Sequence, residues 1–300
     1  MKKIGVLLVT YNHKAKTLSW IKWFLDMFGE HPDIYLLVLD SYSSDGTYES
    51  IKTQYPQVDI RRLNANYGCT TGRNIGIVEL IKLGCEYYCS FDNDVFVEQA
   101  DYFDQMISAM EKSLEVDGFT PILYWGEDRT IASMGSRRRW YGAVRTVKKE
   151  SDNKRVDLIC GGGGAFIRLR SFIKYGLYDN DIPPIGGQDY EWGVRVSKQG
   201  AILCYDPGCR AYHYHQKDQK DNSQKLAFYL EGRGVFLRKH LGLVNIVRDV
   251  IFLLKIVKNY RIKIVMKSYC NGLCKRIRAN NHNYALFFKA GVEKYYAENI

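Results

Sequence analysis

Uninterrupted apolar runs that end in polar residues are the feature that most constrains the fold of this 300-residue chain. "KIGVLLVTY" is followed by Asn12, "IYLLVLD" ends at Asp40, and "CEYYCSF" runs directly into Asp92. Runs without polar alternation indicate strands that are buried on both faces, which is typical of a parallel sheet between helices. Segments with helical spacing, such as 14–28 and 71–83, separate these runs and favour right-handed βα crossovers. The sequence therefore predicts an α/β fold with a Rossmann-like, mostly parallel sheet flanked by helices.

The polar residues at these strand ends predict a ligand site. In open parallel sheets, ligands bind outside the carboxyl ends of the strands. Asn12, Asp40, Asn66, Asp92 and Asp94 each lie at or just beyond such an end. We therefore expect them to line one crevice.

The triplet Asp92-Asn93-Asp94 has two interpretations when taken alone. Burying a carboxylate without a partner is costly, so the triplet is either a solvated turn or a holder of a cation. Hard divalent cations prefer oxygen ligands and often complete their coordination with substrate phosphates and water, so two carboxylates can suffice.

Charge divides the chain into two parts. Residues 225–300 contain 15 Lys and Arg against 4 Asp and Glu, whereas residues 1–224 contain 28 against 29. We expect a catalytic domain over 1–220 and a basic helical extension over 221–300 that stays helical to the end. Its apolar runs, as in "NIVRDVIFLLKIVKNYRIKIVMKSY", are interrupted too often for a membrane-spanning helix.

The basic extension has two compatible interpretations. Basic amphipathic helices lie on anionic membrane surfaces. Alternatively, the extension is a helical cap whose apolar face packs on the body or on a second subunit. The basic residues are mixed with aliphatic ones and no nucleic-acid-binding motif occurs, so we expect no nucleic-acid partner.

The chain start and the cysteines bear on localisation. "MKKIGVLLVTYN" has too short an apolar run for an export signal, and the eight cysteines are scattered. We expect free thiols and a cytoplasmic protein, located in the body of the cytoplasm or peripherally at the inner face of the membrane.

Seven motifs in sequential order carry a resemblance to a known family. "VTYN", "LDSYSSDGT", "NANYGCTTGRNIG", "FDND", "GGGGAFIRLRSF", "IGGQDYEWGVR" and "YDPGCRAYHYH" span residues 3–215. This order resembles the family 2 glycosyltransferases, which are inverting enzymes on the GT-A fold. Many of them, rhamnosyltransferases included, build bacterial surface polysaccharides. The resemblance implies the same fold and activity for this chain.

The resemblance implies a Mn²⁺ or Mg²⁺ site. Asp92-Asn93-Asp94 resembles the family's DXD motif, with Asp94 as the direct ligand and Asp92 on the ribose or on metal-bound water. His213 resembles the histidine that completes the metal shell, and His215 is the alternative. A zinc site that includes Cys204, Cys209 and His213 is a further alternative, although its spacing fits no usual structural pattern.

The resemblance also implies a nucleoside-diphosphate-sugar donor, with UDP, dTDP and GDP left open. Asp40 resembles the aspartate that contacts the nucleobase or the ribose. Arg73 could approach the base or the diphosphate, or could simply belong to the start of a helix. We assign the donor site to Thr10, Asn12, Asp40, Asn66, Arg73, Asp92 and Asn93.

Asp189, in "GGQDYEW", is the expected general base. An inverting transfer needs one carboxylate to take the proton of the acceptor hydroxyl. The family usually has Glu-Asp here, whereas this chain has Gln188-Asp189, so the neighbour carries no charge. Trp192 either packs under a sugar ring or lies in the core. The glycines of "CGGGGAFI" suit a loop that faces the donor sugar and the acceptor, or a strained turn.

Together these residues predict a metal-dependent, inverting transfer of a sugar to a hydroxyl of a glycan or a lipid-diphosphate-linked glycan. Two alternatives belong to other classes. A nucleotidyltransferase predicts a glycine-rich phosphate loop after the first strand, and "TYNHKAKT" contains no glycine. A non-catalytic nucleotide-sugar or membrane-binding protein would need Asp92 and Asp94 but would have no use for Asp189.

Overall fold

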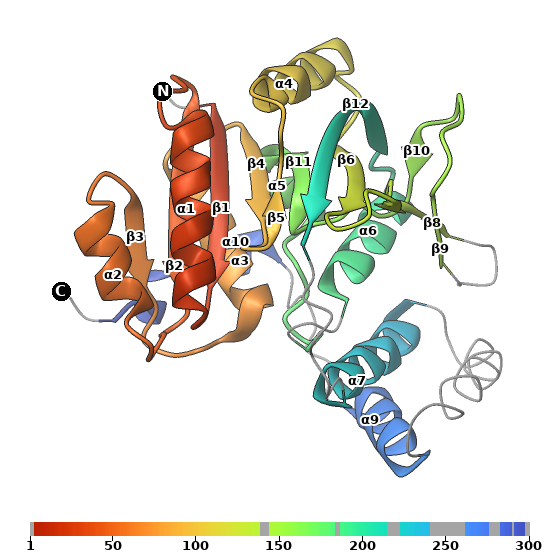
Figure 1. Cartoon of the computed structure of the whole chain (residues 1–300). Helices are drawn as coiled ribbons and strands as arrows, with labels where there is room; N and C mark the ends of the chain where they lie inside the picture. The colour runs from red at the N-terminus through yellow and green to blue at the C-terminus, as the bar shows by residue number, and fades with distance from the viewer. Residues whose placement is uncertain are drawn as a thin grey trace.

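The computed structural model describes residues 3–138, 144–183, 187–214, 223–240, 262–275, 283–289 and 291–297 (Figure 1). The strands are β1 (Ile4–Thr10), β2 (Ile34–Asp40), β3 (Asp59–Arg62), β4 (Tyr87–Phe91), β5 (Val95–Phe96), β6 (Gly118–Trp125), β7 (Ile131–Ser133), β8 (Ser136–Arg138), β9 (Val144–Thr146), β10 (Arg155–Val156), β11 (Gly163–Arg168) and β12 (Leu203–His213). The helices are α1 (Lys14–Phe28), α2 (Thr47–Gln54), α3 (Gly68–Lys82), α4 (Tyr102–Lys112), α5 (Leu169–Tyr175), α6 (Gln188–Lys198), α7 (Ser223–His240), α9 (Ile262–Cys274), α10 (Tyr284–Lys289) and the 3-10 helix η1 (Glu293–Tyr295).

One large sheet organises the chain. Its strand order is β10-β12-β6-β11-β4-β1-β2-β3, with β5 beside β12 and β7 beside β6, while β8 and β9 pair separately. Strands β3, β2, β1 and β4 are parallel, and β11 runs antiparallel to β4. The mostly parallel α/β sheet of the sequence analysis is thus confirmed for the first four strands, and the remainder is mixed.

The register of the parallel strands places the polar strand ends at one edge. Thr10 pairs with Asp40 across β1 and β2, and Leu8 pairs with Phe91 across β1 and β4. Asp92 follows Phe91 directly. The carboxyl ends of these strands therefore lie side by side, as the apolar runs predicted.

Helices cover both faces of the sheet because alternate strand residues point to opposite sides. On one face, Val6 and Leu8 of β1 belong to the core that includes α1 and α4. On the other face, Leu7 belongs to the core that includes α3, α5 and α6. Two separate hydrophobic cores thus hold the sheet rigid between helical layers (Figure 1).

The C-terminal region packs against itself through α7 and α9. Leu230 and Leu237 of α7 contact Val265 and Tyr269 of α9 in a small buried cluster. A Cβ atom added at Gly272 would lie 2.0 Å from the Glu231 carbonyl oxygen, so glycine permits this close helix contact. The apolar face of α9 is therefore covered by α7.

Much of the apolar, basic segment quoted above lies in 241–261, outside the described residues. None of the helices in the described ranges has the length and apolar content to cross a membrane.

The end of the chain returns to the sheet beside β3. Tyr295 O accepts a hydrogen bond from Asn64 N (2.8 Å), and Ala297 N donates to Arg62 O (3.1 Å). Val292 is fully buried in the core on the α3 side. The expectation of a helix to the end is wrong here. Because the backbone groups beside β3 pair with 295–297, this segment extends the sheet edge through an isolated bridge between Leu63 and Tyr296.

A buried polar cluster joins α7 to α6. The Glu191 carboxylate accepts from Arg195 Nε (2.7 Å) and lies 3.0 Å from His240 Nε2. Lys239 of α7 donates to Asp181 Oδ2 (2.8 Å) and also binds Asp179 in the loop before α6. Burial opposes ionisation of Glu191, but His240 and Arg195 lower its pKa to about 2. The end of α7 thus fixes the helix that carries Asp189.

We predict that Glu191→Gln lowers the free energy of unfolding at neutral pH. We also predict that this free energy then falls less steeply as the pH is lowered. The folded-state pKa of Glu191 is about 2, below its unfolded value, so its contribution is complete above about pH 5 and is lost as pH falls towards about 2. The pKa difference corresponds to about 3 kcal/mol at neutral pH. Urea unfolding from pH 7 to pH 3 measures both effects. Glu111→Gln is the control, because Glu111 pairs with Lys3 at the surface, where solvent screens the interaction. Equal losses in the two variants would contradict the prediction.

Candidate active site

The Asp92-Asn93-Asp94 triplet forms the turn between β4 and β5. Val95 N donates to Asp92 O (3.0 Å), which closes the turn, and Asp92 N donates to Gly162 O (2.8 Å). The Asp92 side chain is 55% exposed, whereas that of Asp94 is 23% exposed. The two carboxylates therefore differ in their surroundings although they are two positions apart.

Arg73 connects two carboxylates that are distant in sequence. It lies in α3, and its side chain is only 5% exposed. Its Nη2 donates to Asp92 Oδ1 (2.9 Å), and its Nη1 donates to Asp189 Oδ1 (3.3 Å). Burial lowers the pKa of Arg73, but Cys69, Asp92 and Asp189 raise it well above its usual value. A permanent cation therefore stands between the two aspartates.

Asp189 occupies the first turn of α6, where the helix dipole favours a negative charge. Its side chain is 32% exposed. Burial raises the pKa of Asp189, and Asp92 raises it further, while Arg73 and a hydrogen bond from the Gly161 amide oppose the rise. An aspartate with a raised pKa beside a cavity is suited to accept a proton.

The glycine segment before β11 packs directly on both carboxylates. A Cβ atom at Gly161 would lie 2.4 Å from Asp189 Oδ1, and one at Gly162 would lie 2.4 Å from Asp92 Oδ2. Any other residue would displace these oxygens. The glycines thus permit close approach, as the sequence analysis expected, and the groups that approach are the two site carboxylates.

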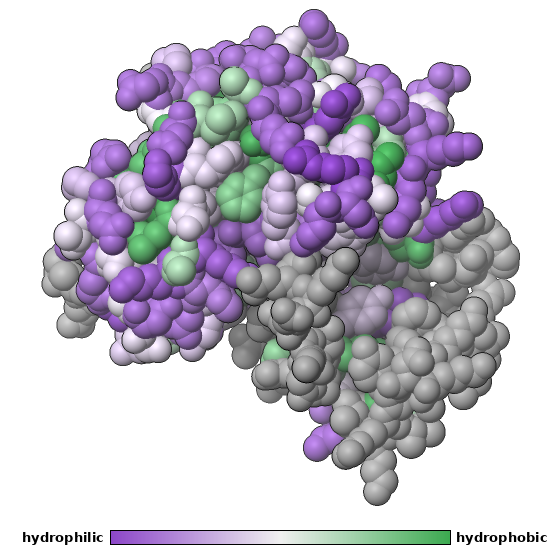
Figure 2. All heavy atoms as spheres, in the orientation of Figure 1, coloured by the Kyte–Doolittle hydropathy of each residue, from purple (hydrophilic) through white to green (hydrophobic). Residues whose placement is uncertain are grey.

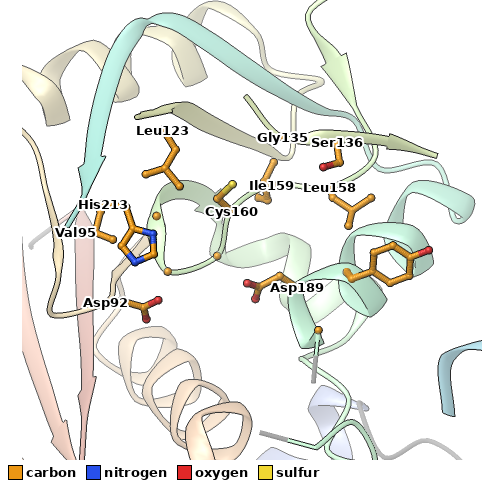
Figure 3. Close-up of a pocket in the computed structure, with 15 residues that line it drawn as sticks. Asp92, Val95, Leu123, Gly135, Ser136, Leu158, Ile159, Cys160, Asp189 and His213 are labelled. Atoms are coloured by element: carbon orange, nitrogen blue, oxygen red, sulfur yellow. The ribbon is translucent and has the colours of Figure 1, made fainter. Parts of the chain in front are cut away.

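These residues surround a cavity of about 320 Å³. Figure 3 shows Asp92 and Asp189 facing each other across it, with His213 above Asp92 and Ser136 on the far wall. Gly135, Ser136 and Tyr190 also line the cavity and were not expected from the sequence. Their positions depend on long-range pairing, so no local motif marks them.

His213 and Asp94 form a pair at the edge of this cavity. His213 Nε2 lies 3.3 Å from Asp94 Oδ1, and the imidazole stacks on Trp125. The antiparallel pairing of His213 with Val95 brings the two residues together. Burial lowers the pKa of His213, but Asp94 and then Asp92 raise it above its usual value.

Asp94 and His213 could supply some, but not all, of the ligands that a divalent cation needs. A carboxylate oxygen and an imidazole nitrogen are ligands that Mn²⁺ accepts. Asp92 is directed towards Arg73 instead. In the part of the chain that the structure describes, no group of three or more His, Cys, Asp or Glu side chains is placed to hold a metal ion. A bound diphosphate would have to supply the remaining ligands.

The zinc alternative gains no support. Cys209 is fully buried in the core on the α1 side, and burial raises the pKa of its thiol. Cys204 lies in β12, and burial raises its thiol pKa too. His215 lies outside the described residues.

Trp192 belongs to the core. Its side chain is 1% exposed and donates a hydrogen bond to Gly176 O, so it does not pack under a sugar.

Asp40 ends β2 and is not among the residues that line the cavity of Asp92 and Asp189. Its side chain is fully buried, and its Oδ2 accepts from Ser43 N (3.0 Å). Its Oδ1 has no hydrogen-bond partner among the described residues. Burial raises the pKa of Asp40, opposed by its hydrogen bonds with Ser43 and by Arg62. Buried carboxylate oxygens usually have a hydrogen-bond partner, so Asp40 Oδ1 is unusual among the described residues.

Thr10, Asn12 and Asn93 lie around the start of α1. The Thr10 and Thr17 hydroxyls are 2.8 Å apart, and Asn93 Nδ2 donates to Thr17 Oγ1 (3.2 Å). Asn12 has a positive φ of 55° and accepts from Ser44 N (3.0 Å). These contacts bring the ends of β1, β2 and β4 together.

Of the predicted donor residues, only Asp92 lines the cavity that contains Asp189. Asn66 lies just before α3. It is exposed, and its Oδ1 accepts from Gly68 N (2.9 Å) at the start of α3. It does not line the cavity that contains Asp92 and Asp189.

Comparison with known proteins agrees with this geometry. The model of the family described as glycosyl transferase family 2 matches residues 5–176. No curated protein matches the chain. One similar solved structure is GalNAc-T7 with UDP, GalNAc and Mn²⁺, at 16% identity and a TM-score of 0.61; the match covers 79% of this chain and 50% of that one. This chain therefore matches only half the length of GalNAc-T7.

A second similar structure is the mannosyltransferase PcManGT from Pyrobaculum calidifontis in complex with GDP-Man and Mn²⁺. Its identity is 12% and its TM-score 0.59, with 96% of this chain and 79% of that one covered. At these identities the likeness establishes the fold, which is the GT-A fold that the resemblance implied. Because the family model matches more than half of the chain, from β1 to the residue after α5, the chain belongs to glycosyl transferase family 2.

Proposed function

We propose that this protein transfers a sugar from a nucleoside diphosphate to an acceptor hydroxyl with inversion at the anomeric carbon. The observation that carries the proposal is the placement of Asp189 and Asp92 across one cavity, with Arg73 bound to both. Membership of glycosyl transferase family 2 supports it. Two proteins of the same fold were crystallised with Mn²⁺ and with UDP or a GDP-sugar.

In this mechanism Asp189 is the general base. It removes the proton of the acceptor hydroxyl while the hydroxyl oxygen attacks the anomeric carbon. A new C–O bond forms, the bond to the diphosphate breaks, and its electron pair leaves with the diphosphate. The proton remains on the Asp189 carboxyl. Attack on the side opposite the diphosphate inverts the anomeric configuration.

Other residues would orient the base and help to neutralise the negative charge of the leaving diphosphate. Arg73 keeps Asp189 ionised and oriented, because its guanidinium is bound to that carboxylate. Asp94 and His213 would hold the Mn²⁺ or Mg²⁺ ion, with Asp92 close to the ribose or to metal-bound water. When bound, such an ion neutralises negative charge on a leaving diphosphate. The unpartnered Asp40 Oδ1 would accept a hydrogen bond from the base or the ribose.

We further propose that the acceptor is a glycan or a lipid-diphosphate-linked glycan of cell-surface polysaccharide synthesis. The catalytic domain would end near residue 220. The basic C-terminal region would hold the enzyme at the inner face of the membrane or contact a second copy. The excess of Lys and Arg in 225–300 supports this placement.

The donor site predicts a metal-dependent thermal shift. We expect one of UDP, dTDP or GDP to raise the melting temperature with Mn²⁺ or Mg²⁺ and not with EDTA. Binding to the folded state alone adds about 2.7 kcal/mol at a ligand concentration of about 100 times Kd. Asp94→Ala should lose the shift, whereas Asp26→Ala, a change at an exposed surface aspartate, should keep it. No shift with any nucleotide would count against the transferase.

If Asp189 is the general base, its removal should slow sugar transfer without preventing nucleotide binding. Asp189→Asn should reduce the transfer rate by about 10²–10⁴-fold, the usual contribution of a general base. Its nucleotide-induced thermal shift should remain, because Asp189 is not one of the residues proposed to bind the nucleotide. Asp26→Asn is the control. If the two variants transfer sugar equally well, Asp189 is not the base, and wild-type nucleotide binding without any transfer would indicate a binding protein.

The surroundings of Asp189 predict a pH dependence that Arg73 controls. The base must be ionised, so kcat/KM falls as pH falls through the raised pKa of Asp189. Arg73 lowers that pKa, and its removal leaves Asp92 to repel the second charge. The acid limb of the pH–rate profile should therefore lie at higher pH in Arg73→Met than in the wild type. If the acid limb lies at the same pH in both proteins, Arg73 does not control the pKa of the base.

A further inference from the structure

A second cavity, of about 880 Å³, is lined mainly by cationic side chains. It lies along strands β8 and β9 and the residues that follow β9. Among the described residues, its lining comprises Arg137, Arg138, Arg145, Thr146, Val147, Lys148 and Lys149. We call the five Arg and Lys residues of this lining the hairpin cations. None of them forms an ion pair with another residue in the described ranges.

The strands that carry these cations are held firmly. Arg137 Nε donates to Arg155 O (2.9 Å), and its Nη2 binds Asn153 O. The backbone amide of Arg138 donates to Asp157 Oδ2 (2.6 Å). Arg137 is therefore part of the scaffold. The other four hairpin cations have exposed side chains.

The local charge is not balanced by nearby carboxylates. Asp157 is engaged by the Arg138 amide, and Glu150 and Asp152 are exposed on the loop beyond Lys149. The positive charge of Arg138 also acts on Lys198 of α6. Burial, and then repulsion by Arg138, lower the pKa of Lys198. A surface on which cations repel one another is prepared for an anion.

Strand β8 contributes residues to both this cavity and the catalytic cavity. Gly135 and Ser136 line the catalytic cavity, and the next residue on β8 is the first hairpin cation. Ser136 pairs with Thr146 across the hairpin, and Val147 N donates to Gly135 O (2.9 Å). Figure 3 shows Ser136 beyond Asp189, on the side away from Asp92. In Figure 2, hydrophilic residues gather where Figure 1 places β8 to β10.

We propose that the hairpin cations bind a phosphate or diphosphate group of the acceptor while its hydroxyl reaches Asp189. The proposal rests on the proposed function and specifies its acceptor. Guanidinium groups bind phosphate through two parallel hydrogen bonds, and lysines add point charges. Four exposed cations exceed what one carboxylate would neutralise. The cavity is also larger than the catalytic one, so it has room for more than a single phosphate.

Calorimetric titration of the full chain tests this site. The probes are inorganic pyrophosphate and farnesyl diphosphate, both in EDTA so that metal-dependent donor binding does not contribute. Arg138→Gln/Arg145→Gln removes two hairpin cations. Lys52→Gln/Lys112→Gln removes the same charge from exposed positions on α2 and α4. We expect the first pair to weaken probe binding by about tenfold or more, because each removes charge-assisted hydrogen bonds, and the control pair to leave it unchanged.

The outcomes separate the possible sources of the phosphate. If farnesyl diphosphate binds more tightly than pyrophosphate with the same dependence on the hairpin, the acceptor phosphate is borne by a lipid. Equal affinity assigns it to a phosphate of the glycan itself. Equal binding by all three proteins, or no binding to the wild type, would overturn the site.

The same variants keep this inference separate from the proposed function. Arg138→Gln/Arg145→Gln should retain the metal-dependent nucleotide shift, because the donor residues are unchanged. A wild type that lacks this shift refutes the proposed transferase, whatever the hairpin binds. A wild type that shows the shift but has no hairpin-dependent phosphate binding refutes the hairpin site alone.

Discussion

The ion pairs of Arg73 with Asp92 and Asp189 are the interaction on which the site depends. Two carboxylates that face one cavity repel each other, and burial raises the pKa of Asp189. Arg73, buried in α3, offsets both effects because it binds each of them directly. The cost of burying its own charge is met by the two aspartates. Removing Arg73 would leave two carboxylates facing one cavity without the cation that binds both.

The scaffold explains why that arrangement needs both halves of the sheet. Asp92 follows β4 in the parallel half, whereas Gly161 and Gly162 precede β11, which runs back along β4. That antiparallel return brings the glycine segment onto the two carboxylates, and only the absence of a Cβ atom leaves space for their oxygens. The position of Asp189 is fixed by α6, because the contact between Glu191 and His240 holds this helix to the end of α7.

The sequence predicts the parallel half well because its signals are local. Strand β2, Ile34–Asp40, is an unbroken apolar run that ends at the Asp40 carboxylate. Strand β11 is not among the predicted elements, since its glycines provide no side-chain pattern. Helix α4 is also absent from them, although Tyr102, Phe103, Met106 and Met110 are spaced as one buried helical face. The partner of Asp189 could not be predicted, because Arg73 lies 116 positions away in the sequence.

Several polar groups of the site are bound to one another. Arg73 binds Asp92, and Asp94 lies against His213. Asp40 Oδ1 is the contrast, because burial has removed it from water without giving it a hydrogen bond. Within the described residues, Asp40 Oδ1 at the end of β2 thus keeps an unmade hydrogen bond, whereas Asp92 and Asp94 beyond β4 are already bound by Arg73 and His213.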